Sequence, residues 1–238
     1  MTSTNQTPSS GEARTATIIA RLSEPRLGPY LAAAGGNHKD ALRLYGWNID
    51  LSGAVYEALH VFEVVLRNAL DQQLCTWNAT QSDATTGLPH ARDWLMDPSR
   101  LLKRLLRDDL EKATKRATTA LRGSGRAPGH PDVLTQLTFG TWRFLLPDRD
   151  PGRRLLWDQA LRHGFPHLSV QPRDLVAQVD GVYRLRNRVA HLEPLLAQGA
   201  VRAEYNAMRH VLAAIDPTIE QWFTSRQRIT AALRARPV

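Results

Sequence analysis

The sequence predicts an all-α fold, organised as a helical bundle with additional helices at its N- and C-terminal ends. From Thr15 onward, apolar residues recur at spacings of three and four, which is the period of an amphipathic helix. No segment shows sustained strict alternation flanked by hairpin turns, so no strand is expected. The hydrophobic content of 42% and charged content of 23% over 238 residues are those of an ordinary globular protein.

The clearest amphipathic helix is centred near residue 62. Its apolar stripe consists of Val55, Leu59, Phe62, Leu66 and Leu70, and residues 50–53 form a start signal before it. A loop over residues 78–90 precedes a basic helix over about 98–121, and the glycine-rich residues 123–129 form a flexible connection. The remaining helical stretches are 131–146, 152–162, 175–191, 198–215 and 217–234. We expect residues 1–13 to be a disordered tail and residues 14–238 to be a single domain.

Several classes of protein are excluded by composition. No run approaches the roughly 20 apolar residues of a membrane-spanning helix, and residues 1–12 are too polar for a secretory leader. Cys75 is the only cysteine, so an internal disulfide is impossible; we expect a core thiol and a cytoplasmic protein. The chain has no phosphate-binding loop and no recurrent metal-ligand motif, so we expect neither a cofactor nor a metal site.

The charge of the chain is unusual. The net charge is +8, and only four of the 31 basic residues are Lys, which leaves 27 Arg. Because the planar guanidinium grips phosphate with two hydrogen bonds, this composition favours RNA as a partner. A GC-rich genome would produce the same bias, and composition does not separate the two readings. Residues 91–126, with ten basic and five acidic side chains, and residues 226–236 are the candidate RNA-facing patches.

Polar residues lie beside the apolar stripe of the helix near residue 62. Glu63 and Arg67 are four residues apart in the order that suits an ion pair, and Asn68 follows directly. A charge at the edge of a core is costly unless it is paired. The pair therefore either stabilises the helix or supports a polar site that the core surrounds.

A second polar group lies near the end of the helix over 175–191. Asn187 and His191 are four residues apart on one face, whereas Arg186 is about 140° from His191 around an ideal helix. Pro194 disfavours helical geometry at Glu193, so the helix is expected to end near the histidine. Imidazole can exchange a proton near neutral pH and guanidinium can stabilise charge on phosphorus, which suits phosphodiester chemistry. A capped helix end with a hydrogen-bonded histidine is the alternative.

These segments resemble a known family. Residues 186–194 are similar to the Arg-x4-6-His signature of HEPN (higher eukaryotes and prokaryotes nucleotide-binding) domains, in the form found in bacterial Abi-like (abortive infection) proteins. Residues 56–69 resemble the Glu-x3-Arg-Asn helix of that family, and residues 137–143 resemble its Phe-Gly-x-Trp segment. The resemblance covers roughly residues 30–208. Relatives often carry a second histidine where this chain has Leu192, so no mechanism with two adjacent histidines is supported.

The resemblance implies a HEPN-type helical bundle that forms a homodimer. It also implies a metal-independent endoribonuclease that acts in phage defence or as a toxin, with an antitoxin or another defence protein as a partner. Arg186 and His191 would be the catalytic pair, oriented by Asn187. The supporting residues would be Glu63, Arg67, Asn68 and Glu193. An RNA 2′-hydroxyl would attack the adjacent phosphate, so DNA would not be cleaved.

Two other functions fit the same residues. The first is a non-catalytic HEPN module that binds RNA or nucleotides, or that serves as the dimeric partner of another defence protein. The second is a structural helical protein whose basic charge reflects genome composition alone. RNA cleavage that depends on His191 would separate the enzyme from both alternatives.

Overall fold

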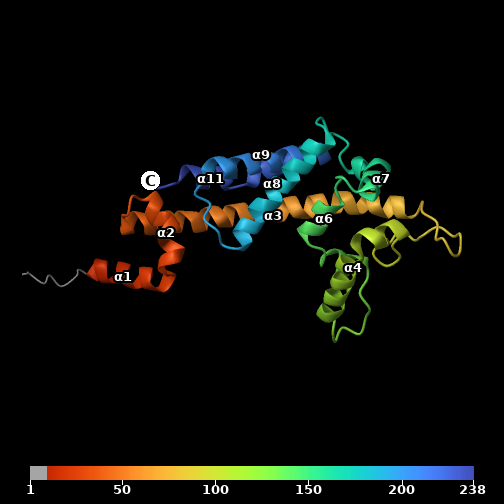
Figure 1. Ribbon diagram of the computed structural model, residues 1–238, viewed down its shortest axis with the longest axis horizontal. Helices are drawn as coiled ribbons and strands as arrows, with labels where there is room; N and C mark the ends of the chain where they lie inside the picture. The colour runs from red at the N-terminus through yellow and green to blue at the C-terminus, as the bar shows by residue number, and fades with distance from the viewer. Residues whose placement is uncertain (1–9) are drawn as a thin grey trace, which may run out of the picture. The chain divides into compact units, whose positions relative to one another are not determined.

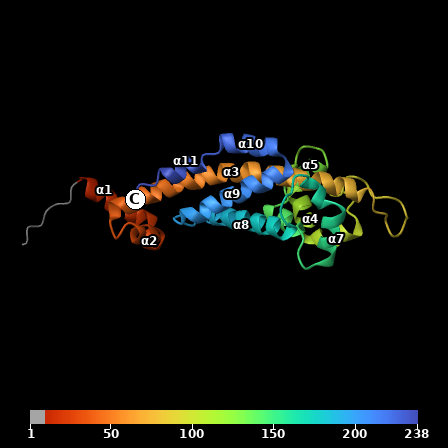
Figure 2. The same ribbon diagram turned by 90° about the horizontal axis from the view of Figure 1, so that it is seen from above.

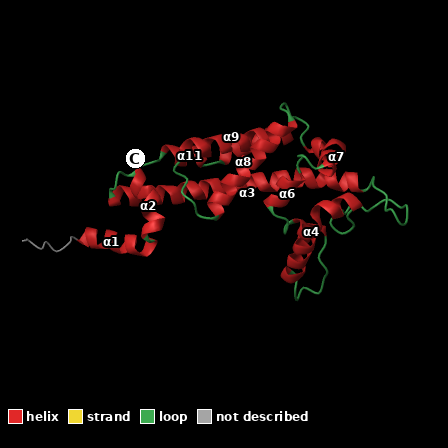
Figure 3. Cartoon of the chain, in the orientation of Figure 1, coloured by secondary structure: helices red, strands yellow, loops and turns green. Residues whose placement is uncertain are grey.

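The computed structural model describes residues 10–238, and the regular structure in this range is helical (Figure 3). A single isolated bridge, between Ser82 and Pro89, is the only β-type pairing among these residues. The predicted all-α class is therefore confirmed. Residues 1–9 of the expected tail lie outside the described residues, and the first helix begins at Ser10, inside that expected tail.

Figures 1 and 2 show the helices from two directions. Their bounds are α1 Ser10–Leu22, α2 Glu24–Ala33, α3 His38–Asn78, α4 Arg100–Ala120, α5 His130–Leu134, α6 Phe139–Leu145, α7 Pro151–Gln159, α8 Pro172–Ala190, α9 Gln198–Ile215, α10 Pro217–Arg226 and α11 Ile229–Arg234. A short 3-10 helix over Leu161–Gly164 follows α7.

Within the described residues, the chain divides into two compact units. The first unit comprises residues 10–58, 188–202 and 227–238, and the second comprises residues 59–187 and 203–226. Helices α3, α8 and α9 each contribute residues to both units. The expectation of one domain over residues 14–238 stays a prediction.

Two buried side chains of α3 bind distant segments of the first unit through hydrogen bonds. The indole N–H of Trp47 donates a hydrogen bond of 2.7 Å to the carbonyl of Ala232. The buried Asn48 accepts the backbone N–H of Leu195 at 2.6 Å. Buried groups of this kind cost free energy unless they are paired, so these bonds dock segments distant in sequence onto α3.

The core of the second unit is built on the predicted apolar stripe of α3. Phe62, Leu66, Leu70 and Leu74 are fully buried. Helix α8 contributes Val179, Val182 and Leu185, which are buried. Helices α8 and α9 lie side by side in Figures 1 and 2, and a Cβ on Gly181 of α8 would lie 2.1 Å from an oxygen of Glu204 on α9. The glycine therefore leaves room for the Glu204 carboxylate.

The start predicted at residues 50–53 for the helix near residue 62 is wrong, because α3 begins earlier. It begins at His38 and continues through Gly53 for 41 residues in all. An internal glycine costs a helix about 1 kcal/mol. Leu51 and Leu59 are buried on either side of Gly53, and burying one such side chain contributes more than that cost.

Two predicted stretches are each divided into two helices. The stretch over 131–146 breaks between α5 and α6, because Thr138 caps α6 by accepting the backbone N–H of Thr141. The stretch over 217–234 breaks between α10 and α11, where the Gln227 side chain accepts the backbone N–H of Thr230 at 3.1 Å. In both cases a side chain competes with the helical backbone for its N–H groups.

The long connection between α3 and α4 is attached to the second unit by Asn78. Its amide nitrogen donates to the carbonyls of Ala91 at 2.7 Å and Asp97 at 2.9 Å. Its oxygen accepts the backbone N–H of Ser99 at 3.0 Å. Asn78 has no exposed surface, so all three bonds are made away from water.

Replacing Asn78 should therefore destabilise the second unit strongly. We expect Asn78→Leu to lower the free energy of unfolding by about 2 to 4 kcal/mol, because it leaves buried backbone groups without partners. Urea unfolding followed by circular dichroism measures the change. Gln72→Leu, at an exposed position of the same helix, is the control and should change stability by less than about 0.5 kcal/mol.

Candidate functional site

Helices α3, α6 and α8, which carry the segments of the family resemblance, contact one another within the second unit. The Phe139 ring of α6 lies between Phe62 of α3 and Tyr183 of α8, with ring centroids 5.8 and 5.5 Å apart and edge-to-face geometry. Gly140 follows Phe139, and a Cβ there would lie 3.4 Å from the Tyr183 hydroxyl. Aromatic pairs of this geometry add about 0.5 to 1.5 kcal/mol each beyond their burial. The packing thus fixes α3 and α8 on either side of α6.

Arg186 pairs with Glu63 across the same two helices. The Arg186 Nε atom lies 3.6 Å from the Glu63 carboxylate, and their side chains are 40% and 31% exposed. The expected ion pair between Glu63 and Arg67 is not found; Arg67 Nε instead donates to the Asn68 Oδ1 atom at 3.3 Å. The spacing along α3 therefore predicted the wrong partner, because packing of α8 brings another guanidinium to the carboxylate.

Asn187 completes what we call the Arg186 cluster, which consists of Glu63, Arg186 and Asn187. Its Oδ1 atom accepts a weak hydrogen bond of 3.5 Å from Arg186 Nη1. A guanidinium held by a carboxylate and an amide oxygen is restricted in orientation but keeps N–H groups for a ligand. Since the Arg186 side chain is partly exposed, an anion can reach it.

The environment of Glu63 disfavours its charge. Burial raises the pKa of its carboxyl above the ordinary value, and the Arg186 charge opposes this effect without overcoming it. His60 and Arg67, on the same helix, act in the same direction as Arg186 but more weakly. The ion pair of Glu63 with Arg186 is thus not strongly stabilising, because burial disfavours the ionised carboxylate.

Helix α8 ends at Ala190, one residue before His191, as the sequence predicts. Leu192 has a positive φ of 58°. Its N–H donates to the carbonyl of Val189 at 3.0 Å, and the N–H of Glu193 donates to the carbonyl of Arg188 at 2.8 Å. This pair of bonds is the Schellman motif, with Leu192 at the position that glycine usually occupies. His191 is therefore the residue that caps the helix.

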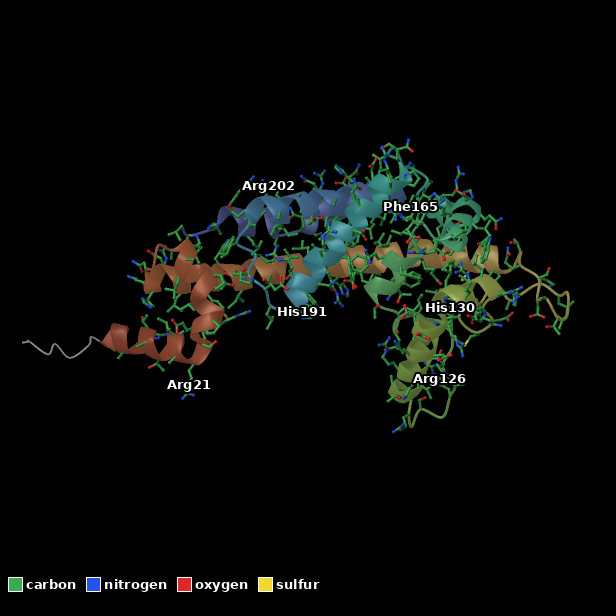
Figure 4. The ribbon with its side chains drawn as sticks, in the orientation of Figure 1. Arg21, Arg126, His130, Phe165, His191 and Arg202 are labelled. Atoms are coloured by element: carbon green, nitrogen blue, oxygen red, sulfur yellow. The ribbon has the colours of Figure 1, made fainter. Side chains whose placement is uncertain are left out.

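The His191 side chain is exposed at this cap (Figure 4), and no hydrogen bond to its imidazole is found among residues 10–238. The alternative, a structural histidine held by a hydrogen bond, therefore gains no support from these residues. Glu193 lies 3.4 Å from the Arg188 Nε atom, so its observed contact is with Arg188. Arg186 and Asn187 belong to the second unit, whereas His191 and Glu193 belong to the first.

The basic stretch over residues 91–126 is partly neutralised. Arg104, Arg107 and Arg126 form ion pairs with Asp150, Glu111 and Asp132. In the second basic patch, Arg228 forms an ion pair with Glu57. Arginines that are paired with carboxylates are less available to bind phosphate. The number of basic residues in these patches therefore overstates the positive charge available to bind RNA.

Sequence reasoning missed a second group of chemically capable side chains. Asp71, Cys75 and His130 come together in the second unit, although the sequence contains no recurrent metal-ligand motif. The spacing of Asp71 and Cys75 was visible in the sequence, but nothing local points to His130. Cys75 is partly exposed rather than a core residue, and burial, together with Asp71, raises the pKa of its thiol to about 11.

Comparison with protein-family models, curated proteins and solved structures found no match to this chain. The resemblance to HEPN domains, including the HEPN-type bundle, therefore stays a prediction. Within the described part of the chain, none of the helices has the length and apolar character needed to cross a bilayer.

The cap at Leu192 leads to a stability prediction. A left-handed backbone is costly for leucine and not for glycine, and the Leu192 side chain is 66% exposed, so little packing is lost on its removal. We expect Leu192→Gly to raise the free energy of unfolding by about 0.5 to 1 kcal/mol. Leu192→Ala retains the backbone strain and should give no such gain in the same urea titration.

The Glu63 environment leads to a pH prediction. Because its pKa is raised in the folded protein, its contribution to stability is fully present below the ordinary carboxyl pKa and is lost as pH rises through the folded pKa. The free energy of unfolding of the unmodified protein minus that of Glu63→Gln should thus fall as the pH rises above the ordinary carboxyl pKa of about 4. Glu57→Gln is the control, because hydrogen bonding from Arg228 lowers the Glu57 pKa and reverses the trend.

Proposed function

We propose that the protein is a metal-independent endoribonuclease of the HEPN type. The observation that carries this proposal is the ion pair between Glu63 and Arg186, which joins the two polar motifs of the sequence. Motifs that are 123 residues apart and meet at a partly exposed guanidinium suit a site for an anionic ligand. An exposed histidine at the cap of the same helix adds a group that can transfer protons.

The proposed chemistry uses one imidazole and one guanidinium. Neutral His191 accepts the proton of an RNA 2′-hydroxyl while the oxygen attacks the adjacent phosphorus. Arg186 stabilises the charge that develops on the phosphoryl oxygens, and Glu63 and Asn187 hold Arg186 in orientation. The bond from phosphorus to the 5′-oxygen breaks, and the imidazolium protonates that oxygen. The products are a 2′,3′-cyclic phosphate and a 5′-hydroxyl, with no change in the net number of protons.

The proposed biological setting is a cytoplasmic homodimer that cleaves RNA in phage defence or as a toxin. An antitoxin or another defence protein would restrain it. The supporting evidence is the family resemblance and the net charge of +8, which favours an RNA partner. The same evidence fits a module that binds RNA without cleaving it. Leu192 stands where relatives often have a second histidine, and its presence is an argument for this second function.

His191→Ala should lower the rate of RNA cleavage by about 100-fold to 10,000-fold, because it removes the proton-transferring group. Arg186→Ala should lower the rate by about 100-fold or more, because the charge on phosphorus loses its stabilising partner. The measurement is cleavage of a labelled oligoribonucleotide in EDTA, with detection of the cyclic phosphate end. His210→Ala, at an exposed position of α9, is the matched control and should cleave normally.

A substrate with a single 2′-deoxy residue should resist cleavage at that residue. Cleavage of this substrate, or activity that only magnesium restores, would contradict the proposed chemistry. If the unmodified protein leaves RNA intact but retards it in a gel at low salt, the RNA-binding module is the better description. If it neither cleaves nor binds RNA, both proposals fail.

A further inference from the structure

A cluster of metal-ligating side chains lies in the second unit, where α5 begins. Asp71 and Cys75 are four residues apart on α3 and therefore share a face, and His130 is the first residue of α5 (Figure 4). The His130 Nε2 atom lies 3.0 and 3.2 Å from the two Asp71 carboxylate oxygens. The Cys75 sulfur lies 3.9 Å from Asp71 Oδ1, and one ligand atom of each residue lies within 4.8 Å of the other two.

These separations suit a shared metal ion. Zinc binds sulfur at about 2.3 Å and nitrogen or oxygen at about 2.0 to 2.2 Å, so neighbouring tetrahedral ligands are about 3.3 to 3.6 Å apart. The observed separations of 3.0 and 3.9 Å lie on either side of that range. All three atoms lie within 4.8 Å of one another, so rotation of the side chains is needed to bring them around one ion.

The surrounding residues hold two of the ligands in the required orientation. Asp93 Oδ1 lies 2.7 Å from His130 Nδ1, which leaves Nε2 directed at Asp71. The indole N–H of the fully buried Trp94 donates to Asp71 Oδ1 at 2.7 Å. A histidine ligand whose other nitrogen bonds a carboxylate is the usual arrangement in metal proteins, because it fixes the tautomer and the ring.

We propose that Asp71, Cys75 and His130 bind a divalent metal ion of the zinc class. A thiolate, an imidazole and a carboxylate form a donor set that favours zinc over magnesium or calcium, which prefer oxygen ligands. Three protein ligands leave a fourth position for water or for the second Asp71 oxygen. On binding, the thiol of Cys75 loses its proton to solvent and its sulfur forms the bond to the metal.

The bound ion would act as a clamp within the second unit. Asp71 and Cys75 belong to α3, His130 belongs to α5, and Asp93 and Trp94 belong to the connection between α3 and α4. None of these five residues is in the Arg186 cluster, so the proposal is independent of the proposed ribonuclease. The competing description is a structural histidine that bridges two aspartates and binds no metal.

Cobalt is a direct probe of this site, because it replaces zinc and absorbs light. The chain contains one cysteine, so a charge-transfer band from sulfur to cobalt can come only from Cys75. We expect tag-free full-length protein, stripped with chelator, to bind one cobalt ion per chain and to develop this band. Zinc should then displace the cobalt and abolish the band.

Variants test each assignment. Cys75→Ser should remove the charge-transfer band, and His130→Gln should lower cobalt affinity by about 100-fold or more. Asp93→Asn should lower the affinity by about 10-fold to 100-fold while keeping the band, because it acts through His130. His60→Gln, which changes an exposed histidine of α3, is the control. It should leave the charge-transfer band and the cobalt affinity unchanged.

Cobalt binding to the unmodified protein tests the proposed metal site even if a variant fails to fold. Absence of stoichiometric cobalt binding, or a band that persists in Cys75→Ser, would overturn the proposal. An increase of the unfolding temperature with zinc that Cys75→Ser and His130→Gln lack would support it, since a ligand that binds only the folded state stabilises that state.

Discussion

The packing of Phe139 between Phe62 and Tyr183 is the constraint on which the candidate site depends. It holds α3 and α8 at the separation where Glu63 and Arg186 form an ion pair. The ion pair alone could not position the helices, because it is partly exposed and burial works against the charge of Glu63. Apolar packing therefore sets the separation of α3 and α8, and the ion pair between Glu63 and Arg186 forms at that separation.

At two other places in the second unit, polar side chains themselves anchor a segment of the chain. Asn78 is fully buried with each of its three observed bonds made to backbone, and it anchors the connection to α4. His130 lies between Asp71 and Asp93 and anchors the start of α5. Both segments also bury apolar side chains, Trp94 in the connection and Val133 in α5. Directional hydrogen bonds therefore add to apolar packing in attaching these segments to the helical core.

Much of the fold follows from local sequence. The helical period identified α4, α8 and α9 closely, and Pro194 indicated where α8 ends. The errors concern boundaries set by competing interactions. Gly53 did not interrupt α3, because buried leucines on either side offset its cost, whereas Thr138 did interrupt the stretch over 131–146 by capping α6. Local propensity is a weak signal when burial differs between neighbouring turns.

The sequence by itself determined the all-α class, the position of the polar end of α8 and the residues that carry the family resemblance. Tertiary structure alone decided which partners those residues have. Glu63 pairs with Arg186 rather than Arg67, and His130 joins Asp71 and Cys75 from 59 and 55 positions along the chain. The physical reason is that an ion pair or a ligand set depends on distances of a few ångströms. For residues far apart in sequence, only the packing of the helices sets such distances.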